Sequence, residues 1–311
     1  MTFTRSERLF IDFHGHLRGR GELLPQAGLV TNVLQFAGTL FEPVLEHGID
    51  WFARYGRHPW LITQYQHFKH LGFSEMVRKF NRYQAQHLLD SMDALGIEST
   101  VICVIEPFFE TFDLLETLSL YPDRFNIFCS VDPNDPSFAE KFAAYMDTGV
   151  VRGLKIHPAL AGPKPMSERM FELIQLAKQY HLPVIIHTGT FPFPLVEGTN
   201  DVRDLEYVIR DFPEVPIVLA HIGWDQYRYV LGLGHDYPNV YTDTSWQTPH
   251  VIREAITAMG ITRVLFGSDY PLFSQARALG ILLQALQPEE LNQVGYRNAQ
   301  NLLNFSRNDH G

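Results

Sequence analysis

Two histidines and an aspartate lie close together near the start of the chain, in the segment IDFHGH at 11–16. Side chains alternate between the two faces of an extended strand, so we expect Asp12, His14 and His16 to point the same way. Imidazole nitrogens and carboxylate oxygens are common ligands of divalent metals such as Zn²⁺. A polar turn after a buried strand would explain a single pair of histidines equally well, so the other polar positions of the chain must discriminate.

Short apolar runs rich in β-branched residues alternate along the chain with segments of helical periodicity. Eight strands are predicted, at 9–13, 101–105, 125–131, 151–156, 183–187, 216–221, 239–243 and 263–269. Segments between them, such as 85–97 and 168–181, have apolar residues three and four positions apart. This order predicts an α/β fold, a (β/α)₈ TIM barrel. An open doubly wound sheet is the alternative, but the segment 14–24 lacks its glycine-rich fingerprint.

Residues able to bind a metal or transfer a proton follow several of the predicted strands. In a TIM barrel the carboxyl ends of the strands meet at one mouth, where the chemistry occurs. The residues at these positions are His14, His16, Lys155, His157, His187, His221 and Asp269. Five of the chain's 14 histidines are among them, which favours a metal site over chance. Asp269 could instead be a turn residue in GSDYP, and Lys155 could be a salt-bridged lysine of the barrel core.

The interval after the first strand is much longer than the others. Residues 17–82 form a predicted insertion rich in aromatic residues, arginine and histidine. We expect it to fold over the barrel mouth, to supply a subunit contact, or to cover the helix layer. We expect residues 1–311 to form a single barrel domain. Residues 288–305 read as a terminal helix pair that packs Leu291, Leu302, Leu303 and Phe305 against the barrel.

The composition narrows the class of protein. The 311 residues are 45% hydrophobic and carry a formal net charge of −10, with no basic run to attract nucleic acid or an anionic membrane. The start of the chain lacks the apolar core of a secretory signal, and no run of about 18 apolar residues could span a bilayer. We therefore predict a cytoplasmic protein. Cys103 and Cys129 both lie in apolar runs and are expected to be buried thiols.

Five motifs in order carry a family resemblance: DFHGH, GLKIHP, IIHTG, LAHIGW and VLFGSDYP. The chain resembles the amidohydrolase superfamily from residue 9 to about 305. The similarity is to the amidohydrolase-related (amidohydrolase 2) branch of metal-dependent hydrolases and aminocarboxymuconate-semialdehyde-type decarboxylases. The resemblance implies a distorted (β/α)₈ barrel and one divalent metal, commonly zinc. It also implies that the metal is held by His14, His16, His187 and Asp269.

The resemblance further implies that His221 lies beside the metal as an acid–base group. In some binuclear members a carboxylated lysine after strand four bridges two metals. Here Lys155 lies in GLKIHP, which is similar to the single-metal branch, so we assign it to substrate binding. Whether Lys155 is carboxylated, and whether the site holds one metal or two, stays open at the level of sequence. The resemblance is compatible with a homodimer.

The residues themselves indicate what such a site can do. Imidazoles and a carboxylate suit Zn²⁺, and Mn²⁺ and Fe²⁺ are alternatives. Zinc lowers the pKa of a bound water to roughly 7, which provides hydroxide near neutral pH. Either His221 or Asp269 could transfer the proton. His157 and Trp224 are further candidates for substrate binding. Asp243 at the end of strand seven could orient His221, and Asp12 could orient a metal ligand.

These observations support one main function and two alternatives. The first is a metal-dependent hydrolase of a C–O or C–N bond in a small carboxylated or lactone-like metabolite. The second is a metal-dependent decarboxylase of an unsaturated or aromatic carboxylic acid. The third is a metal-free barrel that serves as a binding protein. The aromatic residues Phe191, Phe193, Trp224 and Trp246 suggest a planar or apolar portion of the substrate, although they could equally fill the rim of the barrel.

Overall fold

The fold is described here from a computed structural model, which describes residues 9–17, 79–80, 82, 84–191, 196–199 and 201–305. The predicted insertion at 17–82 lies outside the described residues, except for Leu17, Lys79, Phe80 and Arg82. Phe193 also lies outside them.

In the part of the chain that the structure describes, eight parallel strands form one sheet in the order β1 to β8, which is the order of the chain. Each strand overlaps one of the eight predicted runs. The strands are β1 (Phe10–Gly15), β2 (Ile97–Cys103), β3 (Phe125–Cys129), β4 (Val151–Ile156), β5 (Val184–Ile186), β6 (Ile217–Leu219), β7 (Val240–Asp243) and β8 (Val264–Leu265).

The sheet closes on itself between β1 and the segment that begins with β8. The Phe13 amide donates to the Phe266 carbonyl at 2.7 Å, and the His16 amide donates to the Tyr270 carbonyl at 2.6 Å. An isolated parallel bridge pairs Gly15 with Tyr270. The predicted distorted (β/α)₈ barrel is therefore confirmed, and the open doubly wound alternative is wrong.

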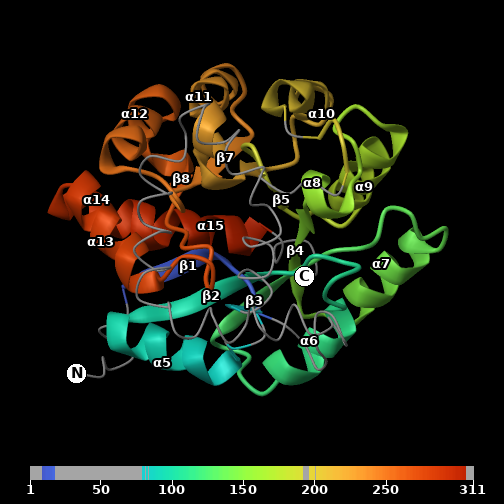
Figure 1. Ribbon diagram of the computed structural model, residues 1–311, viewed down its shortest axis with the longest axis horizontal. Coiled ribbons are helices and arrows are strands. Elements are labelled where there is room, and N and C mark those ends of the chain that lie inside the picture. Colours follow the sequence, from blue (N-terminus) through green and yellow to red (C-terminus); the bar gives the residue numbers. More distant parts are fainter. Residues whose placement is uncertain are drawn as a thin grey trace, which may run out of the picture.

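Helices surround the barrel, as Figure 1 shows. The α-helices between the strands are α5 (Ala85–Leu95), α6 (Thr111–Leu118), α7 (Phe138–Asp147), α8 (Pro158–Ala161), α9 (Glu168–Gln179), α10 (Glu206–Asp211), α11 (Tyr227–Asp236) and α12 (Pro249–Met259). After β8 come α13 (Gln275–Ala285), α14 (Pro288–Asn292), a π-helical turn η5 (Gln293–Arg297) and α15 (Asn298–Phe305). Short 3₁₀ segments are η2 (Val202–Leu205), η3 (Ala220–Gln226) and η4 (Ile261–Arg263).

Local sequence explains where several of these helices begin. Ser167, Thr248 and Ser274 precede α9, α12 and α13, and each hydroxyl accepts a hydrogen bond from a backbone N–H of the first helical turn. Such N-caps satisfy donors that the helix itself cannot pair. They fix the helix starts and so the lengths of the loops that carry the site.

The core has two layers, one inside the barrel and one between the strands and the helices. The buried strand residues of the inner cluster come from six of the eight strands and are Ile11, Phe13, Val101, Cys103, Phe128, Ile185, Val218 and Leu265. Tyr241 of β7 is partly buried and packs against them. Leu302 and Leu303 of α15 join this inner cluster, as the predicted packing of the C-terminal helix requires. Leu291 is only partly buried, against the outer layer. Phe305 is 37% exposed, so the predicted packing of Phe305 against the barrel is wrong.

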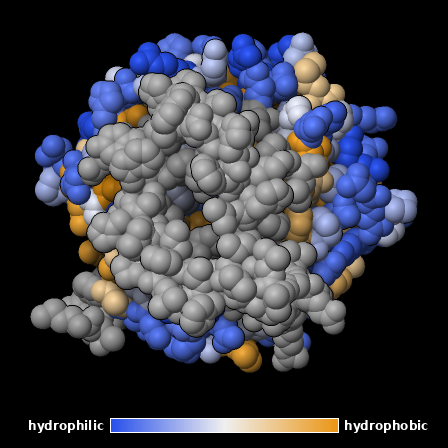
Figure 2. Space-filling view, in the orientation of Figure 1, coloured by the Kyte–Doolittle hydropathy of each residue, from blue (hydrophilic) through white to orange (hydrophobic). Residues whose placement is uncertain are grey.

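The outward faces of the helices are mostly hydrophilic in the view of Figure 2, with hydrophobic residues scattered among them. Among the described residues, no helix is both long enough and apolar enough to cross a membrane. Cys103 and Cys129 are both buried and unpaired with each other, as expected.

Candidate metal centre

A bulge in β1 decides which of its side chains face the barrel mouth. From Asp12 to Gly15 the chain advances three residues while its partner on β2 advances only from Thr100 to Ile102. The extra residue breaks the alternation of faces. His14 and His16 reach the mouth, whereas Asp12 accepts hydrogen bonds from Ser268 and from Gln275 of the outer helix α13. The expectation that all three polar residues share a face is therefore wrong for Asp12.

His14 and His16 each donate their Nδ1 hydrogen to a fixed acceptor. His14 Nδ1 lies 3.0 Å from Asp243 Oδ2, and His16 Nδ1 lies 2.6 Å from the Cys103 carbonyl oxygen. A carboxylate and a carbonyl can only accept, so the hydrogen sits on Nδ1 in both rings. With its hydrogen on Nδ1, each ring presents a lone pair on Nε2, which is the form that binds a metal.

The Asp269 carboxylate meets these two lone pairs. Its Oδ1 lies 3.1 Å from His16 Nε2 and 3.7 Å from His14 Nε2. Acceptor atoms this close need a proton or a cation between them. Among the described residues, His14, His16 and Asp269 form one group whose ligand atoms all lie within 4.8 Å of one another, and His14, His221 and Asp243 form a second.

His187 belongs to neither group, because its ring faces His221. His187 Nδ1 lies 3.2 Å from His221 Nε2, and the two ring centroids are 5.0 Å apart. Its other nitrogen, Nε2, is buried and has no hydrogen-bond partner among the described residues. The structure thus places the fourth predicted ligand at the edge of the triad, with one buried nitrogen still to be satisfied.

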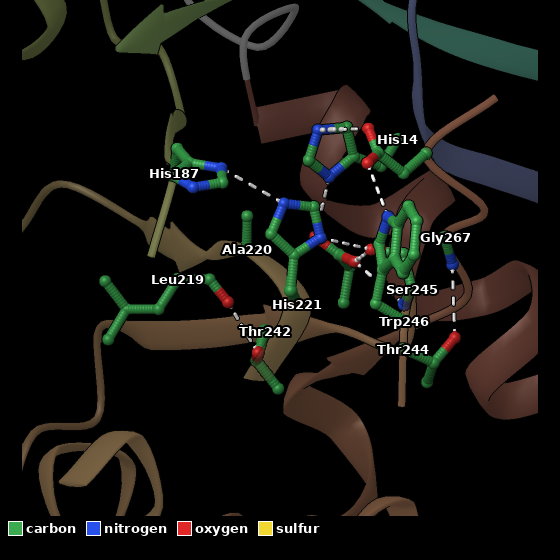
Figure 3. A network of polar contacts seen from close by, with 12 residues as sticks. His14, His187, Leu219, Ala220, His221, Thr242, Thr244, Ser245, Trp246 and Gly267 are labelled. Carbon is green, nitrogen blue, oxygen red and sulfur yellow. Dashed lines mark hydrogen bonds and ion pairs between the residues drawn. The ribbon is translucent and has the colours of Figure 1, made fainter. Parts of the chain in front are cut away.

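His221 is held from its other side by Ser245, as Figure 3 shows. Ser245 Oγ is in hydrogen-bond contact with Asp243 Oδ1, to which it donates, so at 2.7 Å it must accept from His221 Nδ1. This fixes the tautomer of His221 and leaves its Nε2 as an acceptor. Asp243 therefore orients His14 directly and acts on His221 only through Ser245. Gly267 permits this crowding, since a Cβ there would lie 2.9 Å from Asp243 Oδ1.

The backbone after β6 is bent sharply to bring His221 into the mouth. Ala220 already points into the barrel, so regular alternation would turn the next side chain outward. Instead His221, Ile222 and Trp224 all have positive φ, at 62°, 47° and 45°. Such conformations are costly for residues other than glycine and persist only where the surroundings enforce them. Gln247 provides one such restraint, because its buried amide donates to the carbonyls of His221 and Trp224.

Burial favours the neutral form of four imidazoles of the site, those of His14, His157, His187 and His221. It lowers the pKa of His221 to about 4, and it lowers the pKa of His14 with help from the nearby Lys155 charge. The pKa values of His157 and His187 also fall well below the usual value, chiefly through burial. For Asp269, burial acts to raise the pKa, but the nearby imidazoles of His16, His14 and His221 hold it below its usual value.

An apolar cavity opens over the site. Its polar lining is His16, His157, His187, His221 and Asp269, and its apolar lining is Phe80, Ile105, Phe108, Phe109, Leu160, Phe191 and Leu272. The lining brings together residues far apart in the sequence, from His16 to Leu272. Phe80 is one of the few described residues of the predicted insertion. Its ring packs edge-on against that of His16, with the ring centroids 5.8 Å apart.

The three predicted substrate-binding residues lie at different depths. His157 lines the cavity and stacks on His187 at 3.9 Å, while its Nδ1 accepts from the Leu160 amide at the start of α8. Lys155 is buried and is not among the described residues that line the cavity, and its Nζ lies 3.1 Å from His14 Nε2. Trp224 is buried and is not among the described residues that line the cavity.

Sequence reasoning missed the positioning roles of Ser245 and Gln247 and named Trp246 only as an aromatic residue near the substrate. Trp246 Nε1 donates to Asp269 Oδ2 at 2.6 Å. The signal was available, since the run TSWQ at 244–247 follows a strand that ends in an aspartate at the barrel mouth. What the sequence does not give is the positive φ of 58° at Trp246, which turns the indole toward Asp269.

The donor set fits a divalent metal. The ligands that such ions take are supplied by the Nε2 lone pairs of His14 and His16, a carboxylate oxygen of Asp269 and the buried Nε2 of His187, which has no partner among the described residues. A metal on His14 Nε2 would use the lone pair that faces Lys155 Nζ. The identity of the metal is not decided by these ligands, because imidazole and carboxylate suit several divalent ions.

Comparison with known proteins extends over nearly all of the chain. A family model described as Amidohydrolase matches residues 11–305. Protein fluG of Emericella nidulans is 29% identical over 133 residues. That match covers 36% of this chain and 15% of the relative, so the chain spans only a small part of that protein's length.

Solved structures share the fold. An uncharacterised TIM-barrel protein of Bordetella bronchiseptica is 18% identical, with a TM-score of 0.66 and coverage of 96% of this chain and 99% of that one. A 5-carboxyvanillate decarboxylase of Novosphingobium aromaticivorans, complexed with manganese and 4-hydroxy-3-methoxy-5-nitrobenzoic acid, is 17% identical. Its TM-score is 0.62, and the match covers 97% of each chain. At these identities the similarity shows the barrel and not the reaction.

Proposed function

The chain belongs to the amidohydrolase family, and we propose that it is a metal-dependent decarboxylase of a small aromatic or unsaturated carboxylic acid. The observation that carries this proposal is the convergence of His14 Nε2, His16 Nε2 and Asp269 Oδ1 below an aromatic cavity, beside the acceptor nitrogen of His221. The sequence alone placed hydrolysis first. The order is reversed because the manganese-containing structural neighbour is a decarboxylase.

His14, His16 and Asp269 would hold the metal, with His187 as a further ligand through its buried Nε2. Mn²⁺ and Zn²⁺ both suit this set, and Fe²⁺ is an alternative. When bound, a divalent ion would supply Lewis-acid polarisation of the substrate's oxygen atoms. Asp243 and the Cys103 carbonyl keep the two imidazoles in the tautomer and orientation that ligation needs.

His221 is the proton-transfer residue in this proposal. Its pKa of about 4 leaves it neutral at physiological pH. His221 lines the cavity, and its Nε2 is an acceptor that lies 3.2 Å from His187 Nδ1. It can take the proton of a substrate hydroxyl and return it to the ring carbon that loses carbon dioxide. The proton is conserved over the two steps, and the carboxylate leaves as CO₂ with its bonding electrons passing to the ring.

The cavity walls select the substrate in this proposal. Phe80, Phe108, Phe109 and Phe191 suit a planar ring and exclude water from it. His157 lies at the polar edge of the same cavity, where it can contact the substrate. Lys155 Nζ, 3.1 Å from His14 Nε2, is a donor that suits a substrate carboxylate, and Trp224 belongs to the bent segment that carries His221.

Hydrolysis of a C–O or C–N bond is the second candidate, favoured by the description of the family model as an amidohydrolase. In that reaction His221 would accept the proton of the attacking water. The third possibility, a metal-free binding protein, requires that the convergent nitrogens bind no metal. All three possibilities can be separated with one preparation of protein.

The test is product analysis on protein purified without chelator and loaded with Mn²⁺ or Zn²⁺. We expect CO₂ release from a hydroxylated aromatic acid, and its loss in His221→Ala. The matched control is His235→Ala, the same change at an exposed position of α11. Turnover of lactones or amides without CO₂ release would favour hydrolysis, and absence of bound metal would favour the binding protein.

A further inference from the structure

The two oxygens of the Asp269 carboxylate have different environments. Oδ1 faces His16 Nε2 at 3.1 Å, on the side where the metal ligands converge. Oδ2 accepts a hydrogen bond of 2.6 Å from Trp246 Nε1. The indole nitrogen can only donate, so the direction of this bond needs no assumption about protonation. The second oxygen of Asp269 is therefore already engaged.

The backbone is distorted at both ends of this hydrogen bond. Trp246 has φ 58° and Asp269 has φ 66°, both in the left-handed region. Bulky residues rarely adopt this region, and such outliers cluster at functional sites. The indole ring is also packed against Phe273, with centroids 5.2 Å apart. Geometry that is unfavourable for the backbone is thus maintained where it places the indole on the carboxylate.

The residues on either side of Trp246 contact His221 instead. Ser245 Oγ accepts from His221 Nδ1, and the Gln247 amide donates to the His221 carbonyl. Three consecutive side chains after β7 therefore hold the two groups that the sequence left as rival proton acceptors. Ser245 keeps the hydrogen of His221 on Nδ1, so that Nε2 is an acceptor, which lies 3.2 Å from His187 Nδ1. Trp246 covers the second oxygen of Asp269.

We propose that Trp246 is a positioning residue that restricts Asp269 to one-oxygen ligation and leaves proton transfer to His221. This inference rests on the proposed function. If Oδ2 were released, it could bind the metal as a second ligand atom and take a coordination position that the substrate needs. Trp246 prevents this by holding Oδ2 away from the metal with a charge-assisted hydrogen bond.

The test compares metal binding in the wild type and in Trp246→Phe, which keeps a ring beside Phe273 but removes the N–H. Affinity is measured by titration with Mn²⁺, following the paramagnetic resonance of the free ion. Coordination is followed by the visible absorption of the Co²⁺-loaded protein. We expect Mn²⁺ affinity to fall by roughly 10- to 100-fold, because the loss of the fixed carboxylate orientation outweighs the gain of a second ligand oxygen. We also expect the Co²⁺ bands to weaken and shift as the second oxygen binds.

Phe273→Leu is the matched control, because it disturbs the packing of the indole and leaves its N–H in place. It should keep the wild-type Co²⁺ spectrum. If Trp246→Phe does not fold, site-specific replacement of Trp246 by β-(3-benzothienyl)alanine removes the N–H at nearly constant shape. An unchanged affinity and spectrum in either N–H-free protein would overturn the inference.

The inference and the proposed function fail in different ways. A wild type that binds Mn²⁺ with the predicted response to Trp246→Phe, but turns over no carboxylic acid, removes the decarboxylase and retains the role of Trp246. A wild type that releases CO₂ and is insensitive to loss of the indole N–H removes the role of Trp246 alone. A wild type that binds neither Mn²⁺ nor Co²⁺ overturns both.

Discussion

The inside of the barrel and its mouth are adjacent layers built on different principles. Inside, residues such as Phe13 and Phe128 follow the strand alternation, and their rings pack edge-on with centroids 5.5 Å apart. At the mouth, His221, Trp246 and Asp269 have positive φ, and buried polar atoms replace apolar ones. The interior uses regular geometry to stabilise the fold, whereas the mouth departs from it to aim particular atoms at one point.

Among substitutions at the mouth, the largest effect on catalysis is expected from His221→Gln, which keeps a polar side chain but removes the acceptor nitrogen. We expect kcat to fall by roughly 10²- to 10⁴-fold, the usual contribution of a positioned acid or base. Steady-state kinetics and metal content measured on the same sample provide the check. Retention of full turnover would assign proton transfer to another group, and loss of metal would make His221 a ligand.

A substitution inside the barrel should lower the stability of the fold and leave metal binding unchanged. Phe128→Ala removes a fully buried ring that packs on Phe13, and we expect a loss of about 3 to 5 kcal/mol in the free energy of unfolding. Denaturant unfolding measures the loss. Protein that remains folded should bind one metal with unchanged affinity. A selective loss of metal affinity at full stability would mean that the two layers do not divide their roles as described.

Gln247→Leu tests the bent segment that separates mouth from interior. The change leaves the carbonyls of His221 and Trp224 without this amide donor, and we expect a loss of about 1 to 3 kcal/mol in the free energy of unfolding. We also expect kcat to fall while KM changes little, because His221 loses its position. If stability falls and kcat is unchanged, the amide supports the fold alone.

The pH dependence of stability should come from the mouth. His14, His157, His187 and His221 have lowered pKa values, so between pH 6.5 and about 4 the unfolded chain binds more protons than the folded one. The stability that these histidines contribute is therefore fully present above pH 6.5 and is lost as the pH falls toward about 4. Asp12, whose pKa is raised to about 6, opposes this trend with one group.

His157→Asn measures one histidine's share of that slope. Asparagine can still accept from the Leu160 amide but cannot titrate, so the slope of stability against pH should fall by up to about 1.4 kcal/mol per pH unit. Chemical unfolding at several pH values between 4 and 7 provides the measurement. An unchanged slope would show that His157 is not held neutral in the folded protein.

The same division between layers explains how far the sequence could be interpreted. All eight strands were predicted, because alternation and helical periodicity follow from side chains that pack on a regular backbone. The positions of His14, His16 and Asp269 followed from the rule that strand ends converge. The orientation of Asp12 did not, because a single-residue bulge reverses the face and leaves no mark in the pattern of residue types.

The hydrogen bonds that assign roles to the residues at the mouth could not be predicted from the sequence either. That Asp243 contacts His14 directly and His221 through Ser245 depends on left-handed backbone and on close approach at Gly267. Neither follows from the spacing of residues along a strand. The contact between Trp246 and Asp269 joins two loops 23 residues apart, and no local pattern predicts it.

The central claim is that His14 Nε2, His16 Nε2 and Asp269 Oδ1 bind one divalent metal. Crystals of protein loaded with Mn²⁺ and measured at the manganese absorption edge test it most directly. The account predicts one anomalous peak within about 2.0 to 2.3 Å of all three atoms, the usual range for such ligands. The absence of a peak there, or a peak bound to other side chains, would contradict it.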